Sequence, residues 1–150
     1  MPYLAGQTLT AAMLTKYVTS VNPSTNATFS AHQVLPDDTV TFMAIASHRY
    51  KVSYSTRHSN SSGTATSPAA VGCNLRWVAG AGPITPSSTV IRGFAFPSTG
   101  GNGDFSGFKT IVFGVTGLVT VGVSASANIG TSTFNGGTTE RELLVEDVNP

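Results

Sequence analysis

Three histidines have the widest chemical range in this 150-residue chain, since imidazole serves as acid, base or metal ligand near neutral pH. His32 and His58 lie in loop-like contexts, and His48 begins a predicted strand. None has a second histidine, cysteine or carboxylate at a spacing that would bring ligands together. The sequence therefore predicts no metal site and no cofactor, and only a site assembled from distant segments stays open.

Adjacent carboxylates raise the question of glycoside hydrolysis, which needs two Asp or Glu side chains flanking one sugar bond. The available pairs are Asp37-Asp38 and Glu146-Asp147. Neighbouring residues of a strand point to opposite faces, so each pair suits a solvated strand end better than a cleft. The chain also lacks the Gly-x-Ser-x-Gly pattern of serine hydrolases. We expect no catalytic residue, and hydrolysis of cell-wall polysaccharide stays an alternative that turnover lost in Asp104→Asn would support.

A glycine-rich segment, residues 100–104 (GGNGD), is similar to the G-G-x-G-x-D repeat that binds calcium. The aspartate comes one position early and the motif occurs once, so we interpret it as a turn. It belongs to one of two predicted exposed loops, residues 98–104 and the polar residues 59–68. The candidate ligand residues of these loops are Asn60, Asn102 and Asp104.

The composition favours a β-domain that binds or assembles. Charged residues make up 10% of the chain, against about 25% in an ordinary soluble domain, and residues 110–139 carry no charge. A net charge of +1 with scattered Lys and Arg gives no field that attracts phosphates, so we expect no nucleic-acid partner. No signal-peptide pattern and no apolar run of about 20 residues occurs, so we also expect no membrane partner.

Short runs of alternating apolar and polar residues between turn residues predict an all-β fold, an antiparallel jelly-roll-like sandwich. We expect strands at residues 39–46, 48–55, 71–77, 89–96, 105–115, 118–127 and 140–148. Thr116-Gly117 fits a tight hairpin turn. Small outward residues in 118–127 would let another sheet or subunit approach closely. The single cysteine, Cys73, excludes an intrachain disulfide and is predicted to be a small buried apolar residue.

One short helix is expected over residues 10–18, with Thr10 as its cap. Its apolar face consists of Leu9, Met13, Leu14 and Tyr17. A helix of this length is marginal alone, so it must dock either on its own sheet or in a neighbouring subunit. We therefore predict two parts, an N-terminal helix and linker (residues 1–27) that is a candidate anchor, and a β-sandwich domain (residues 28–150).

The two ends of the chain carry a resemblance. Residues 4–14 read LAGQTLTAAML and residues 143–150 read LLVEDVNP. They resemble the ends of small virion proteins from tailed bacteriophages, especially those infecting actinobacteria, in which A-G-Q-x-L-T-A and L-x-V-E-D-V/I-G-P bracket a variable β-rich middle. Asn149 stands where that group usually has Gly. The resemblance implies a non-enzymatic structural protein of the virion, made in the host cytoplasm, of the minor tail, fibre-head or capsid-decoration type.

Six phenylalanines exceed what one small core obviously needs: Phe94, Phe96, Phe105, Phe108, Phe113 and Phe134. Surplus aromatic residues commonly mark an interface. We expect a homotrimer, with the first four of these as interface candidates, bound to other virion proteins of the capsid or tail. The alternatives are that all six fill the core, and that the protein is a receptor-binding module whose loops bind host cell-wall carbohydrate.

Overall fold

The computed structural model describes residues 17–137 and 140–149, and within these ranges the chain forms ten strands and no helix. The strands are β1 (Tyr17–Val21), β2 (Ala27–Phe29), β3 (Gln33–Ala44), β4 (Tyr50–Asn60), β5 (Ala69–Ala79), β6 (Thr89–Ser98), β7 (Gly103–Ile111), β8 (Gly117–Ala127), β9 (Ser132–Phe134) and β10 (Arg141–Asp147).

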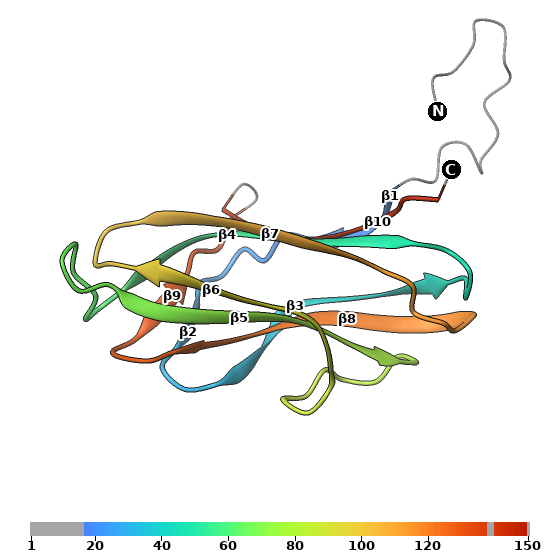
Figure 1. Ribbon diagram of the computed structural model, residues 1–150, viewed down its shortest axis with the longest axis horizontal. Helices are drawn as coiled ribbons and strands as arrows, with labels where there is room; N and C mark the ends of the chain where they lie inside the picture. The colour runs from blue at the N-terminus through green and yellow to red at the C-terminus, as the bar shows by residue number, and fades with distance from the viewer. Residues whose placement is uncertain (1–16, 138–139, 150) are drawn as a thin grey trace, which may run out of the picture.

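The strands form two antiparallel sheets, which lie over each other as the layers of a sandwich (Figure 1). Sheet A has the order β1-β10-β4-β9-β2, and β7 pairs with the other edge of β4. Sheet B has the order β3-β8-β5-β6. The predicted all-β sandwich of antiparallel sheets is therefore confirmed.

Alternating side chains build the core between the sheets. In β4, Tyr50, Val52 and Tyr54 are buried and their neighbours face outward, as the period of two predicted. In β5, Cys73 is a fully buried free thiol among the apolar residues of the core. Burial raises the pKa of this thiol well above its usual value. The prediction of a buried, apolar role for Cys73 is confirmed.

The predicted hairpin at Thr116-Gly117 is wrong, because β7 and β8 belong to different sheets. Residues 112–116 instead cross from sheet A to sheet B. Phe113 anchors this crossing in the core, where its ring packs against Phe42, Tyr50 and Trp77. Gly117, where β8 begins, has φ of 149°, a conformation that other residues rarely adopt.

The small residues on the outer side of β8 are covered by the chain itself rather than by another subunit. Thr120 and Ser124 are buried, and a Cβ on Gly122 would come within 2.8 Å of Ile84. Ile84 lies in the connection between β5 and β6, which therefore folds over sheet B. The close approach was predicted, but the partner is intramolecular.

The predicted helix over residues 10–18 is wrong at its carboxyl end. Residues 10–16 lie outside the described residues, with Leu9, Met13 and Leu14 of the predicted apolar face. Tyr17 and Val18 belong to β1, which pairs with β10 from Tyr17↔Glu146 to Val21↔Leu143. The β-branched residues of β1 and the edge offered by β10 override the local helical pattern. The division of the chain at residue 27 stays a prediction; β1 and β2 are strands of sheet A.

Both predicted loops are shorter than expected. β4 continues to Asn60, β6 continues to Ser98, and β7 begins at Gly103. Pro97 is tolerated within β6 because this strand is an edge of sheet B, where a missing N–H leaves no partner unpaired.

Two interruptions of sheet A lie side by side. Residues 22–26 separate β1 from β2, and residues 135–140 separate β9 from β10, while β4 runs past both breaks. The Gly137 N–H donates to the Pro23 carbonyl at 2.9 Å, and the Gly136 N–H donates to Asn26 Oδ1 at 2.8 Å. These bonds join the two interrupting segments, so the pairing of β1 with β10 and the pairing of β2 with β9 are linked within one sheet.

Gly63 is required at the tip of the β4–β5 loop. A Cβ there would collide with the Ser98 carbonyl and lie 2.9 Å from the Ala69 amide, both backbone groups that cannot move aside. We expect Gly63→Ala to lower the free energy of unfolding by about 1–3 kcal/mol, measured by chemical denaturation. Gly82→Ala is the matched control, since no atom lies within 4 Å of its added Cβ. Equal stability of the two variants would contradict this account.

Candidate functional site

The outer face of sheet A carries a groove built by alternate residues of three neighbouring strands. β4 contributes Lys51, Ser53, Ser55 and Arg57. These positions alternate with the buried Val52, Tyr54 and Thr56, so the same period that fills the core also aligns the polar side chains outside. β7 lines the groove on one side of β4, and Glu140 together with Glu142 and Leu144 of β10 lines it on the other.

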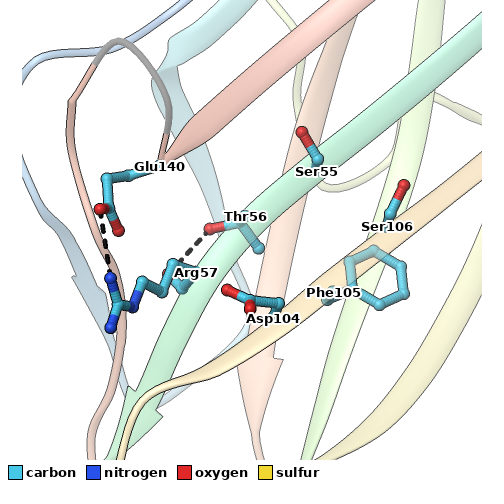
Figure 2. Close-up of a pocket in the computed structure, with 7 residues that line it drawn as sticks. All are labelled: Ser55, Thr56, Arg57, Asp104, Phe105, Ser106 and Glu140. Carbon is cyan, nitrogen blue, oxygen red and sulfur yellow. Dashed lines mark hydrogen bonds and ion pairs between the residues drawn. The ribbon is translucent and has the colours of Figure 1, made fainter.

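The first part of the groove is a depression of about 430 Å³ that contains an ion pair (Figure 2). Arg57 Nη1 lies 3.3 Å from Glu140 Oε1, and the Arg57 amide donates to the Glu140 carbonyl at 2.7 Å. Asp104 lies opposite Arg57 in the β4–β7 register. The hydroxyls of Ser55 and Ser106 line the same depression. This part of the groove therefore offers donors and acceptors of both charges.

The second part is a depression of about 260 Å³ that is also lined by Ser55 and Ser106, so the two adjoin each other. Its main apolar group is Phe108, which is 61% exposed. Lys51 Nζ lies 5.4 Å from the centroid of the Phe108 ring and 3.1 Å from Glu146 Oε2. We call the two depressions together the sheet A groove.

The candidate ligand residues are separated by the structure. Asp104 lies in the sheet A groove, and Asn102 is exposed in the β6–β7 connection. Asn60 is buried, where its side-chain oxygen accepts from the amides of Ser62 and Gly63 at 2.8 Å. Asn60 therefore shapes the β4–β5 loop and does not reach the surface.

The interface candidates also divide. Phe105 of β7 stacks on Phe96 of β6 at a centroid distance of 4.3 Å and meets Phe94 edge-on at 5.3 Å. Phe113 and Phe134 are buried in the core. Of these aromatic residues, Phe108 has a largely exposed side chain and stands in the groove.

The histidines lie apart and have separate partners. His32 Nε2 lies 3.0 Å from Ser124 Oγ, His48 Nδ1 lies 2.6 Å from Asp147 Oδ2, and His58 Nδ1 lies 2.8 Å from Ser98 Oγ. Burial lowers the pKa of His58, an effect that Asp104 opposes. In the part of the chain that the structure describes, no three His, Cys, Asp or Glu side chains gather as metal ligands. No helix in that part could span a membrane.

The expectation that Asp37 and Asp38 lie at a solvated strand end is wrong for Asp38. Its side chain is fully buried between the sheets, and its Oδ1 lies 3.0 Å from Nε of Arg141, which is also buried. Burial raises the pKa of Asp38 to about 7, although the Arg141 guanidinium lowers it. The Arg141 Nη1 also donates to the Phe134 carbonyl at 3.0 Å. The pair ties β3 to β10 and lies outside the groove.

A second surface is apolar. Eight large apolar side chains are exposed in the described residues, and five lie where β3 and β10 end and β8 begins: Met43, Ile45, Val112, Leu118 and Val148. Met43 faces Leu118 across the β3–β8 pair. We call this surface the apolar end. A neighbouring depression of about 490 Å³ is lined by Val18 of β1 and by residues of β3, so the chain enters the sandwich beside the apolar end.

Two carboxylates lie in one depression of the sheet A groove. Glu140 is ion-paired to Arg57, and Asp104 belongs to β7 on the other side of β4.

Sequence comparisons find no relatives for the chain: no model of a protein family matches it, and no curated protein gives a significant match. Several solved structures are similar in fold. The Eiger TNF protein of S. frugiperda is 8% identical with a TM-score of 0.47, covering 85% of this chain and 94% of its own. A CBM4 structure is 10% identical with a TM-score of 0.43, covering 88% and 96%.

Viral proteins also occur among these structures. Tailspike protein 4 of bacteriophage CBA120, in its enzymatically active domain, is 10% identical with a TM-score of 0.39. The similarity covers 87% of this chain but 19% of the tailspike chain. At these identities and TM-scores, none of the three similarities indicates a function.

Proposed function

We propose that the protein is a non-enzymatic structural component of a bacteriophage virion, which assembles as a homotrimer and decorates or stabilises the capsid or tail. The apolar end is the observation that carries this proposal. Gathered, exposed apolar side chains on a folded domain mark a surface that another macromolecule covers. The first described strand, β1, lies beside this surface.

Two further observations support this assignment. The strand order β3-β8-β5-β6 of sheet B and the neighbours β1-β10-β4-β7 within sheet A are compatible with a jelly roll, an architecture found in viral capsid domains. The carboxyl-terminal segment that resembles phage virion proteins forms β10, whose Leu143 and Val145 are fully buried. The resemblance therefore involves residues on which this fold depends.

The apolar end predicts a specific assembly defect. In the full chain, Met43→Asp places a charge on a surface that must lose its water, so we expect incorporation into virions of the encoding phage to fall at least tenfold. An unpaired buried charge costs several kcal/mol, and about 1.4 kcal/mol corresponds to tenfold. Quantitative mass spectrometry of purified particles measures the copy number.

Ile129→Asp is the matched control, because Ile129 is also exposed but follows the end of β8, whereas the apolar end lies where β8 begins. We expect both variants to stay folded and the control to enter particles normally. Light scattering on the purified wild-type chain should give the mass of a trimer. Absence of the protein from purified particles, or normal incorporation of Met43→Asp, would overturn the proposal.

A further inference from the structure

The sheet A groove is elongated. Its floor follows β4 from Lys51 to Arg57, six residue steps that span about 20 Å at 3.3 Å per residue. Ser55 and Ser106 line both of its parts. A site of this shape fits an extended polymer better than a compact small molecule.

The charges of the groove argue against nucleic acid and against a second protein. Lys51 is paired with Glu146 and Arg57 with Glu140, and Asp104 and Glu142 add further negative charge. A nucleic acid needs a continuous basic surface. Protein interfaces are depleted of charged residues at their centres, whereas charged side chains line this groove along its length. An uncharged polymer with many hydroxyl groups needs neither a continuous basic surface nor a binding surface whose centre is free of charge.

The groove also combines an aromatic ring with unused polar atoms. Phe108 is largely exposed beside Ser53 and Ser106. Within the described residues, Ser53 Oγ and Glu140 Oε2 make no hydrogen bond, and one lies in each half of the groove. Both oxygens are shielded from water, and a polar atom in that state is destabilising until it finds a partner.

From this combination we propose that the sheet A groove binds a neutral oligosaccharide chain, an activity that goes beyond the virion role. The C–H face of one sugar ring packs on Phe108. Hydroxyls of neighbouring sugars bond to Ser53, Ser55 and Ser106, and those at the far end bond to Arg57 and Asp104. The site lies on a sheet face, whereas the sequence pointed to the loops, and of the predicted ligand residues it includes Asp104.

Binding to a glycan array tests the proposal with the full-length protein. The probes are neutral glucan, galactan and mannan oligosaccharides, with a sulfated polysaccharide as the charged control. We expect binding to at least one neutral chain, weakened about tenfold or more in Phe108→Ala because a stacking ring is lost. Arg57→Ala should weaken the same binding, since it removes hydroxyl contacts at the other half of the groove.

Met43→Ala is the matched control, because it removes an equally exposed apolar side chain from a different surface. It should bind the glycan as the wild type does, and circular dichroism should show all variants folded. No binding to any neutral glycan, binding to the sulfated chain alone, or undiminished binding by Phe108→Ala would each overturn the proposal. Particle incorporation is measured separately, so either proposal can fail while the other stands.

Discussion

Arg141→Met lowers the free energy of unfolding by about 3–5 kcal/mol, the usual cost of breaking a buried ion pair from one side. Asp38 and Arg141 are both almost fully buried, and the substitution leaves the Asp38 carboxyl group without its partner between the sheets. It also removes the hydrogen bond to the Phe134 carbonyl. Urea denaturation followed by Trp77 fluorescence measures the change.

The double variant Asp38→Ala/Arg141→Met distinguishes the loss of the whole ion pair from the loss of one of its two charges. Removing both charges leaves no uncompensated charge, so we expect it to be more stable than Arg141→Met alone. Arg49→Met, at an exposed arginine, controls for the chemistry of the substitution. If Arg141→Met behaved like Arg49→Met, the ion pair would contribute nothing to stability.

Phe134→Ala should lower the free energy of unfolding by about 3–5 kcal/mol as well. The Phe134 ring is fully buried and contacts Phe29 at a centroid distance of 4.8 Å, Tyr54 at 6.1 Å and Phe96 at 6.3 Å. Its removal leaves a cavity between strands of both sheets, because β6 contributes Phe96 from sheet B. Thermal and urea unfolding measure the loss.

Phe108→Ala makes the same chemical change at an exposed ring and should alter stability by less than about 1 kcal/mol. Both variants lose the same side chain, so a difference between their stability changes reflects the burial of Phe134. Similar losses in the two variants would mean that Phe134 does not occupy a rigid core position.

The alternation of apolar and polar residues was enough to predict individual strands, but it did not show which strands pair or which side chains meet. Tyr50, Val52 and Tyr54 alternate with polar residues, so β4 was expected. The burial of Asp38 was not, since Pro36 and Asp37 are typical of a turn and the register of β3 with β8 shifts between Leu35 and Thr39. Arg141 gives no local signal either, because its partner lies about a hundred residues away in the chain.

Among the residues of the groove, the sequence predicted Asp104 as a ligand residue. The other polar residues were missed because the sequence does not show which strands pair. Asp104 drew attention through its glycine-rich neighbourhood. Arg57, Ser106 and Glu140 lie on different strands, and their proximity follows from the pairing of β4 with β7 and β10. Phe108 was expected at an interface, and the structure leaves it exposed beside polar groups.

Cys73 gives the protein an internal reporter of opening. Its thiol is fully buried in β5, and the raised pKa leaves almost no reactive thiolate near neutral pH. A thiol reagent reaches it when β5 separates from its neighbours, so the rate of labelling measures how often the sandwich opens. Because Cys73 is the chain's single cysteine, its labelling rate can be measured on the wild-type protein without introducing a labelling site by mutation.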